Sequence, residues 1–413
     1  MIPMAVPILS AALLAHAISA SAFPAFKEHV INANAGTGLA ITVADVNKDG
    51  KLDIVGVSAD DVAWYENPTW ERHLIAGKIR NSNVCIAAED LDGDGIPEFA
   101  LGADWQPNNT TSGGALFLLS HREDVKQPWK VTTLVEEEPT LHRIQWADLD
   151  GDGKKELVVA PLKGANSTGP DFTDIGVKLY ALFPGENPLE TPWREEIIST
   201  DLHIVHNLFV HPPGPGAKKL YQSVTFAARE GLMTFGRHGG EPPSYGASQL
   251  NKILVPPLVP EGAGEIKSVE IDTADVGTAP MFMVATIEPW HGNQVVVYLG
   301  PDHGGSMRRF VIDDQLKGGH AIWFDDFDQD GEAELLVGFR ENAGPKQLPG
   351  LNIYDLHIDA ENNVTAEKHV IDDGGMATED ARSADLNGDG WPDIVAFGRA
   401  TTNIKYYENL GKP

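Results

Sequence analysis

Short apolar runs alternate with tight acidic loops along most of the chain. Residues 41–44 (ITVA) precede a loop that begins at Asp45, and residues 54–57 (IVGV) follow it. Residues 144–147 and 157–160 flank a second loop of the same form. Two apolar runs joined by a turn rich in Asp and Gly predict a β-hairpin. The chain is therefore expected to be all-β.

Five loops share the pattern D-x-[DN]-x-D-G-x-x-[DE]. Their first, third, fifth and ninth positions carry carboxylate or amide oxygens, which are hard ligands of the kind that Ca²⁺ prefers. The glycine lets each loop turn with a positive φ. An acidic turn satisfied by its own backbone amides is the alternative. The residues at the four positions are Asp45, Asn47, Asp49, Asp53; Asp90, Asp92, Asp94, Glu98; Asp148, Asp150, Asp152, Glu156; Asp326, Asp328, Asp330, Glu334; and Asp385, Asn387, Asp389, Asp393.

Two degenerate copies of this unit fill the long gap between the third and fourth acidic loops. They lie at residues 211–224, where the acids are missing, and at residues 272–285. Successive units are about 45–63 residues apart, which is the length of a four-stranded propeller blade. Residues 62–65 and 70–75 illustrate the third and fourth strands of a unit. Seven units predict a seven-bladed β-propeller.

The two ends of the chain are expected to close the ring together. The last unit ends at residues 404–409 and lacks a fourth strand, whereas residues 26–31 (FKEHVI) look like the fourth strands elsewhere, such as residues 368–371 (KHVI). Pairing these two segments removes the open sheet edges without a disulfide. We therefore expect one propeller domain over residues 23–413.

The repeated acidic hairpins resemble the FG-GAP/VCBS family of β-propellers, and the resemblance extends over residues 24–413. It implies that all five acidic loops bind Ca²⁺, although the ninth-position acid differs from EF-hand spacing. It also implies that these sites are structural, because they lie at the hairpin end opposite the usual binding face of a propeller. These motifs are specific for the fold and the metal, and weak for an activity.

Composition narrows the possible partners. The chain has 413 residues with 60 Asp and Glu against 31 Lys and Arg, a formal charge of -29. Such a chain is not expected to bind nucleic acid or an anionic membrane surface. Cys85 is the only cysteine, so no internal disulfide can form, and its apolar neighbours indicate a small buried hydrophobe. We expect a monomer.

The N-terminal segment indicates export. Residues 5–20 are apolar and lead to Ala20-Ser21-Ala22, a pattern typical of a signal peptide cleaved after Ala22. No basic side chain precedes this segment, and an ordinary N-terminus is the alternative. Residues 1–22 are thus predicted to be a signal peptide, and the protein to be secreted. Sequons for N-glycosylation occur at Asn108, Asn109, Asn166 and Asn363.

Histidines recur at one place before the innermost strands. His142 and His320 come six residues before the first acid of their loops, and His206 has a similar place in the fourth unit. In a ring these three side chains should approach one axis, where they could exchange protons or bind a second metal. Hydrogen bonding to neighbouring backbone is the alternative. Glu379 and Asp380 hold the matching place in the seventh unit.

Cations recur in the loops after the second strands, and they suggest an anion site in a very acidic chain. Arginine offers a planar fork that suits a carboxylate. Pairing with adjacent acids such as Glu230 or Glu341 is the alternative. Aromatic residues in the matching loops could stack on a sugar ring. The substrate-binding candidates are Arg143, Lys163, Arg229, Arg340, Arg399, Trp105, Trp290 and His291.

These residues fit a secreted carbon–oxygen lyase that acts on an anionic carbohydrate. β-Elimination at a uronate needs a cation on the carboxylate, a base for the α-proton and an acid for the leaving oxygen. The propeller resembles rhamnosyl-glucuronate lyases, which trim gum arabic side chains, and the propeller of aldos-2-ulose dehydratases. The latter carry further domains for which this chain has no room, so the uronate reaction is favoured.

Two other classes of function remain open. A non-catalytic propeller that binds glycan or protein would explain the repeats and Ca²⁺ equally well. Glycoside hydrolysis needs acids facing each other across the channel. Only Glu379 and Asp380 are available, and both belong to one unit.

Overall fold

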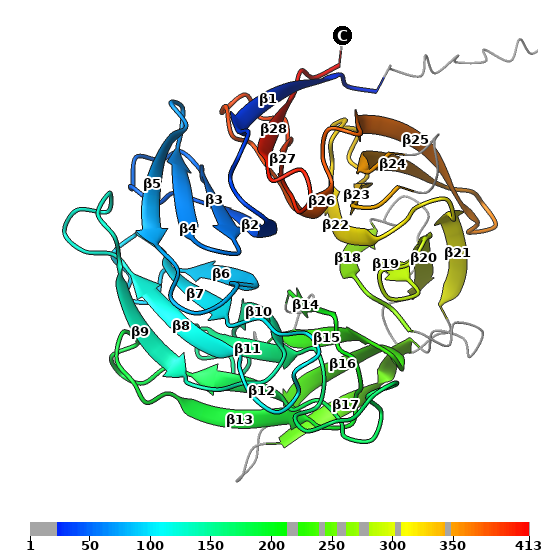
Figure 1. Ribbon diagram of the computed structural model, residues 1–413. Helices are drawn as coiled ribbons and strands as arrows, with labels where there is room; N and C mark the ends of the chain where they lie inside the picture. The colour runs from blue at the N-terminus through cyan, green and yellow to red at the C-terminus, as the bar shows by residue number, and fades with distance from the viewer. Residues whose placement is uncertain are drawn as a thin grey trace, which may run out of the picture.

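In the computed structural model, seven antiparallel sheets of four strands each surround a central axis (Figure 1). The structure describes residues 23–212, 222–238, 244–253, 262–271, 281–301, 307–342 and 348–412. The predicted signal peptide, residues 1–22, and the loops of the two degenerate units, residues 213–221 and 272–280, lie outside the described residues. The expected seven-bladed all-β propeller is confirmed.

The blades are numbered in chain order, and each is given from its innermost to its outermost strand. Blade 1 contains β2 (Gly38–Ala44), β3 (Asp53–Ser58), β4 (Val62–Glu66) and β5 (Glu71–Ala76). Blade 2 contains β6 (Cys85–Glu89), β7 (Glu98–Ala103), β8 (Ala115–Ser120) and β9 (Lys130–Val135). Blade 3 contains β10 (Leu141–Ala147), β11 (Glu156–Pro161), β12 (Leu179–Phe183) and β13 (Arg194–Ser199).

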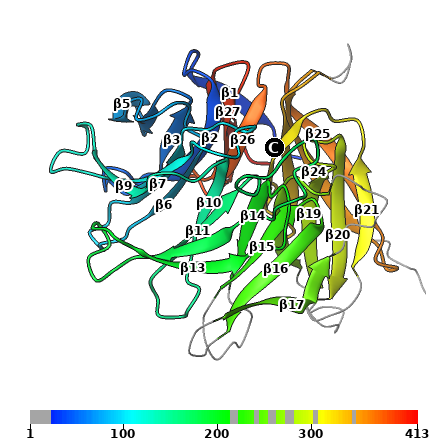
Figure 2. The same cartoon turned by 60° about the horizontal axis from the view of Figure 1, so that its bottom comes forward.

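The remaining blades follow the same order, and Figure 2 shows the four strands of blade 4. Blade 4 contains β14 (Asn207–His211), β15 (Ser223–Ala228), β16 (Gly231–His238) and β17 (Ser244–Ile253). Blade 5 contains β18 (Ile266–Ile271), β19 (Met281–Glu288), β20 (Gln294–Pro301) and β21 (Arg308–Asp313). Blade 6 contains β22 (Gly319–Asp325), β23 (Glu334–Phe339), β24 (Gly350–Ile358) and β25 (Val364–Asp373). Blade 7 contains β26 (Thr378–Ala384), β27 (Asp393–Gly398), β28 (Ile404–Asn409) and β1 (Phe26–Asn32).

The N-terminal strand closes the ring as the sequence predicts. β1 pairs antiparallel with β28, with Phe26 opposite Asn409. Lys405 of β28 donates to Glu28 of β1 at 2.8 Å and to Asp372 of the preceding blade at 2.8 Å. The closing strand is therefore held by a backbone ladder and by charged contacts.

Apolar side chains fill the spaces between neighbouring blades. Trp64 of blade 1, for example, packs in one cluster with Phe99 and Phe117 of blade 2. Cys85 is buried in the next cluster, as expected, and burial raises the pKa of its thiol to about 12. Among the described residues, no helix is long and apolar enough to cross a membrane.

Candidate functional site

A β-bulge at the start of the innermost strand directs one side chain toward the axis in four blades. The strand register shifts by one residue at this place, which leaves that residue out of the ladder. Bulges re-aim side chains in this way. The residues so placed are Leu39 in blade 1, His142 in blade 3, His320 in blade 6 and Glu379 in blade 7.

The other three blades supply the same position just before their innermost strand. Val84 of blade 2 and His206 of blade 4 each donate their backbone N–H to a carbonyl of the second strand, at 2.9 Å. Gly264 of blade 5 donates to the carbonyl of Ile287 in the same way. These seven residues form one layer around the axis, and we call this layer the axial ring.

Blade 5 has no side chain in the axial ring, and His291 occupies that place. His291 lies in the loop between β19 and β20, and its backbone N would be only 3.2 Å from a Cβ atom on Gly264. Its φ of 50° is in the left-handed region, which few non-glycine residues adopt. The glycine and the loop together bring a fourth imidazole to the axis.

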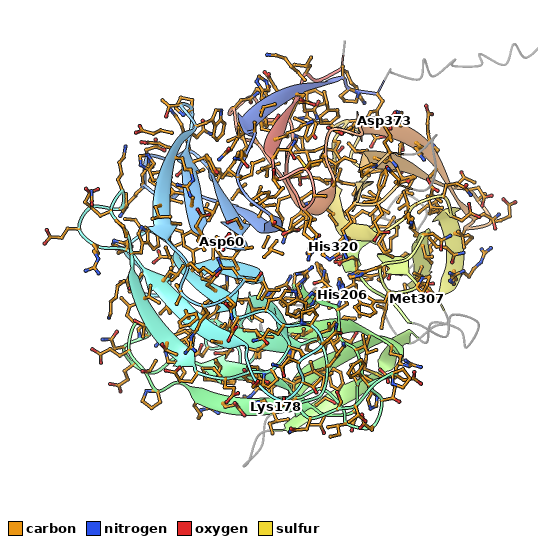
Figure 3. All side chains as sticks on the ribbon, in the orientation of Figure 1. Asp60, Lys178, His206, Met307, His320 and Asp373 are labelled. Carbon is orange, nitrogen blue, oxygen red and sulfur yellow. The ribbon has the colours of Figure 1, made fainter. Side chains whose placement is uncertain are left out.

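A cavity of about 200 Å³ opens over the axial ring. Figure 3 shows His206 and His320 close to each other near the centre of the propeller. The cavity contains ten of the eleven predicted catalytic and substrate-binding residues. These are Trp105, His142, Arg143, Lys163, His206, Trp290, His291, His320, Arg340 and Arg399.

Arg229 is the exception, and its predicted place in the cavity was wrong. Its guanidinium contacts the backbone carbonyl of Asp171 at 3.5 Å, away from the axial residues. The neighbouring Glu230 does not pair with it and instead contacts His203 Nδ1 at 2.7 Å. An equivalent place in the sequence did not fix the direction of a long side chain on an irregular loop.

The three ring histidines each donate a hydrogen bond through Nδ1 to the backbone of the next blade. His142 donates to the carbonyl of His206 at 2.9 Å, His206 to that of Gly264 at 2.9 Å, and His320 to that of Glu379 at 2.6 Å. The alternative interpretation of these histidines thus holds for one nitrogen of each ring. It also fixes the tautomer, so that Nε2 carries the lone pair.

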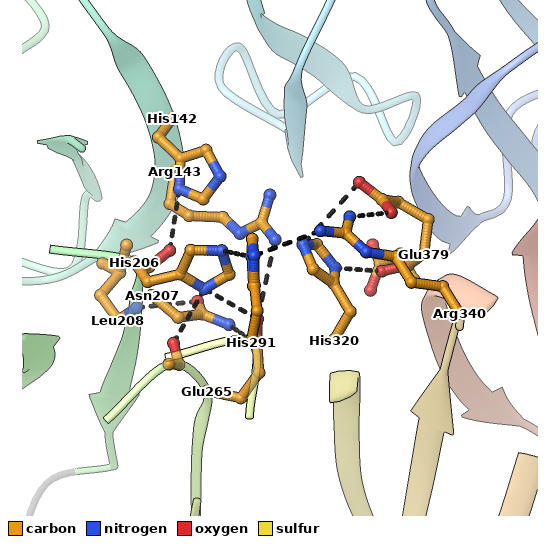
Figure 4. Close-up of polar contacts among 12 residues, drawn as sticks. His142, Arg143, His206, Asn207, Leu208, Glu265, His291, His320, Arg340 and Glu379 are labelled. Atoms are coloured by element: carbon orange, nitrogen blue, oxygen red, sulfur yellow. Dashed lines mark hydrogen bonds and ion pairs between the residues drawn. The ribbon is translucent and has the colours of Figure 1, made fainter. Parts of the chain in front are cut away.

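His291 is hydrogen-bonded between an arginine and His206 (Figure 4). Arg340 Nη2 lies 3.2 Å from His291 Nδ1, which must accept because a guanidinium only donates. His291 Nε2 therefore carries the proton and donates it to His206 Nε2 at 2.6 Å. Among the described residues, this leaves the Nε2 atoms of His142 and His320 without a hydrogen-bond donor.

Burial favours the neutral form of these imidazoles. Burial and the nearby arginine side chains lower the pKa of His142, His206 and His320 well below 6.5. For His206 and His320 these arginines include Arg143 and Arg340. Neutral imidazoles at physiological pH are able to accept a proton or to bind a metal ion.

Two guanidiniums share one carboxylate at the other side of the cavity. Arg340 Nη1 lies 2.5 Å from Glu379 Oε2, and Arg399 Nη1 lies 2.5 Å from Glu379 Oε1. Neither arginine pairs with an adjacent acid, since Glu341 instead contacts Lys317 at 3.6 Å. With Arg143 and Lys163, the lining has four cationic side chains and a single carboxylate. This excess of positive charge suits an anion.

Hydrolysis by paired acids would need two carboxylates that face each other across the cavity. Asp380 does not line this cavity but a second one below it, where it contacts Arg382 at 2.5 Å. Glu379 is thus the one carboxylate among the described residues of the cavity. The geometry does not favour a glycosidase.

The five acidic loops lie at the opposite end of the innermost strands from the cavity, as the sequence implies. In each loop the first-position Asp accepts the N–H of the glycine, whose φ lies between 87° and 94°. The ninth-position acid turns inward and accepts the N–H of the second-position residue. The loops therefore satisfy some of their carboxylate oxygens with their own amides.

The remaining oxygens fit a divalent cation. Three loops place carboxylate oxygens of three or four acids within 4.8 Å of one another. Burial raises the pKa of the ninth-position carboxyls, to about 6 for Asp53 and Asp393, about 7 for Glu98 and about 8 for Glu156 and Glu334. Bound Ca²⁺ would neutralise these groups, so Ca²⁺ in the loops remains a prediction that the geometry supports.

Chelation is expected to lower thermal stability most at alkaline pH. The ninth-position pKa values are higher in the folded chain than in the unfolded chain. Without Ca²⁺, stability should therefore fall as pH rises from about 4.5 to 8, and saturating Ca²⁺ should oppose this fall. Melting curves with EDTA and with Ca²⁺ at pH values across this window test the idea. Equal melting temperatures throughout, or native protein free of calcium by elemental analysis, would contradict it.

The fold and the loops define the class of protein, and the comparisons with known proteins agree. Residues 45–101 match an FG-GAP-like repeat, and residues 113–300 match the β-propeller domain of aldos-2-ulose dehydratase. The chain is thus a seven-bladed β-propeller that contains an FG-GAP-like repeat and resembles the propeller of that dehydratase. The matched segment includes His142, His206 and His291, whereas His320, Arg340 and Glu379 lie beyond it.

A curated relative and two solved structures extend this result. The chain is 24% identical over 290 residues to aldos-2-ulose dehydratase of Phanerodontia chrysosporium, covering 66% of this chain and 31% of that protein. It therefore spans about a third of that relative. BBS1N in complex with ARL6DN has a TM-score of 0.55 at 12% identity, covering 94% of this chain and 96% of that chain. An ancestral GH74 enzyme has a TM-score of 0.55 at 10% identity, covering 92% and 48%. The two structures show the fold alone.

Proposed function

We propose that the axial cavity is the active site of a secreted carbon–oxygen lyase that cleaves an anionic carbohydrate by β-elimination at a uronate. The observation that carries the proposal is one neutral base beside paired guanidiniums. His320 holds a free Nε2 lone pair and lies next to Glu379, which Arg340 and Arg399 share. The likeness to the propeller of a sugar dehydratase supports elimination as the class of reaction.

The first step is recognition of the uronate carboxylate. Arg340 is mostly buried, while Arg399 is 38% exposed at the mouth of the cavity. The carboxylate would bind the guanidinium donors that Glu379 leaves unused. Neutralising the carboxylate acidifies the proton on the adjacent carbon, because negative charge builds up there as the proton leaves. Trp105 and Trp290 offer apolar faces for the sugar ring.

The tautomers dictate how the proton moves. His320 Nε2 accepts the α-proton, and the electron pair of the broken C–H bond forms the double bond as the C–O bond breaks. His142 and His320 begin without an Nε2 proton, and the Nε2 proton of His291 is donated to His206. The proton available for the leaving oxygen is therefore the one that His320 has just taken. This favours elimination on one face of the sugar.

Dehydration of an aldos-2-ulose is the second candidate, and two observations favour it. The first is the match to the dehydratase propeller. The second is that His206, His291 and His320 bring ring nitrogens within 4.8 Å of one another, which fits a transition-metal ion. Such an ion, held by these three residues, would supply polarisation of a keto oxygen. His142 lies outside this trio, and its Nε2 stays free to accept a proton.

A pair of substrates distinguishes these functions. The protein is incubated with a glucuronate-capped glycan and, separately, with an aldos-2-ulose. An unsaturated uronate, detected by its ultraviolet absorbance, supports the first candidate, and a dehydrated ketose supports the second. Binding of glycan without either product would favour a non-catalytic propeller.

The Arg340→Lys variant is expected to weaken turnover of the uronate substrate about tenfold or more. Lysine keeps the charge but loses the planar fork that binds a carboxylate through two bonds. The matched control is Arg229→Lys, the same change at the equivalent loop of blade 4, outside the cavity. Steady-state kinetics should separate the two variants. Equal loss in both, or in neither, would contradict the role of Arg340.

A further inference from the structure

A second chamber of about 320 Å³ lies on the axis beneath the cavity, between the innermost strands. Arg143 lines both spaces, so its side chain stands between them. The charged residues of the lower chamber are four cations and three acids. They are Arg143, Lys155, Lys267 and Arg382, and Glu89, Glu265 and Asp380.

Each acid of the lower chamber has partners of its own. Glu89 contacts Lys155 at 2.6 Å, and Asp380 contacts Arg382 at 2.5 Å and accepts the N–H of Ile41 at 3.1 Å. Glu265 accepts from Asn207 and lies 3.0 Å from His206 Nδ1 (Figure 4). None of these contacts involves Lys267. The three carboxylates are thus paired with residues other than Lys267.

Lys267 takes no part in the ion pairs of the lower chamber. Its residue is only 8% exposed, and its Nζ lies 4.7 Å from the ring centre of Trp323 and 5.3 Å from that of Phe209. The aromatic faces attract the ammonium group but leave its three N–H donors unused. Among the described residues, Lys267 has no hydrogen bond or ion pair. Burial is the main cause that lowers its pKa to about 7; Arg382 and Arg143 lower the pKa further, whereas Asp380 and Glu265 act in the opposite direction.

Arg143 is the second cation with little compensation. Its nearest acidic contact is Glu265 Oε1 at 3.9 Å, which is too long for a hydrogen bond. Arg143 and Lys267 both line the lower chamber, and their charges repel. Placing two such groups at one space is unfavourable unless an anion joins them.

We propose that the lower chamber is an anion-binding site in which Lys267 and Arg143 hold a small monovalent anion, either a halide or a carboxylate. The anion would accept the unused N–H donors of Lys267 and balance the single excess positive charge of the chamber. It would also keep Arg143 in place between the two spaces. This site is separate from the Arg340–Glu379–Arg399 group and does not depend on the proposed lyase activity.

Crystals soaked in bromide test the site directly. An anomalous peak at hydrogen-bond distance from Lys267 Nζ is expected for the unaltered protein and not for Lys267→Met. Lys155→Met is the matched control in the same chamber, because Lys155 is already paired with Glu89, and it should keep the peak. A wild-type chamber without bromide density would overturn the proposal.

Melting curves provide a second test and separate the possible anions. Chloride, acetate and glucuronate are compared with neutral glucose at constant ionic strength. A stabilising anion should bind Lys267→Met about tenfold more weakly or worse, because a charge-assisted hydrogen bond is lost. Without anion, Lys267→Met should be at least as stable as the unaltered protein, since methionine removes an uncompensated buried charge.

Stabilisation by halide alone identifies an inorganic ion, and stabilisation by glucuronate that survives Arg340→Lys identifies a sugar acid. Equal stabilisation of the unaltered protein and Lys267→Met by every anion would overturn the proposal.

Discussion

Replacing His320 by asparagine is expected to reduce the elimination rate by about 10²–10⁴, the usual contribution of a general base. The asparagine amide can still donate to the carbonyl of Glu379, as Nδ1 does at 2.6 Å, so the local structure is retained. What disappears is the Nε2 lone pair. The loss should appear mainly in kcat, with a small change in melting temperature. An Asn variant that keeps full kcat would rule out His320 as the base.

The matched variant is His142→Asn, which makes the same change at the axial-ring residue of blade 3. His142 also donates Nδ1–H to a carbonyl and also has a free Nε2. A large effect at His320 and a smaller one at His142 would assign the base. The reverse order would move that role to His142. Because the pKa of His320 lies well below 6.5, the acid limb of the rate profile should lie below that pH.

Removing residues 23–34 is expected to lower the melting temperature by about 10 °C or more. β28 would lose its partner strand over the register from Phe26 to Asn32, and the closing blade would have an open edge. Lys405 would also lose Glu28, and Glu408 would lose its contact with His29 at 2.7 Å. Differential scanning calorimetry measures the change.

A permuted chain is the sharpest control for that deletion. Phe26 lies opposite Asn409, so residues 23–34 can be attached after residue 413 and still fold back onto β28. The permuted protein should melt near the unaltered protein, because the strand is restored with the connection that the other blades use. If the permuted protein were as unstable as the deletion, strand pairing would not be the cause. An unchanged melting temperature after deletion would contradict closure by β1.

The fold could be predicted because its signals are local and repeated. A loop such as Asp148–Glu156 fixes a hairpin through its own amides, and its spacing fixes the blade. The axial position of His142 and His320 follows from counting back to the loop, since the bulge is identical in both blades. The two degenerate units could also be predicted, although neither keeps the full acidic pattern.

The site was less predictable wherever a contact joins residues from different loops and strands. The pairing of Arg340 and Arg399 with Glu379 depends on how two loops meet the bulge of β26, and no local pattern encodes it. Glu379 lies six residues before the first acid of its loop, as His142 and His320 do, and this spacing was the signal for its place on the axis. Glu265 could not be predicted because it follows Gly264, which holds the axial-ring position of blade 5 but has no side chain to mark it.

The axial ring has a consequence for changing specificity. Blades 1 and 2 contribute Leu39 and Val84 to the cavity, whereas the histidines and Glu379 come from later blades. The axial ring is therefore apolar at blades 1 and 2 and polar or charged at blades 3, 4, 6 and 7. Both Leu39 and Val84 are almost fully buried, so a replacement has to be apolar and of similar volume. A library of apolar replacements at Leu39 and Val84 would change the shape of the cavity at blades 1 and 2. The histidines and Glu379 of the later blades would stay unchanged.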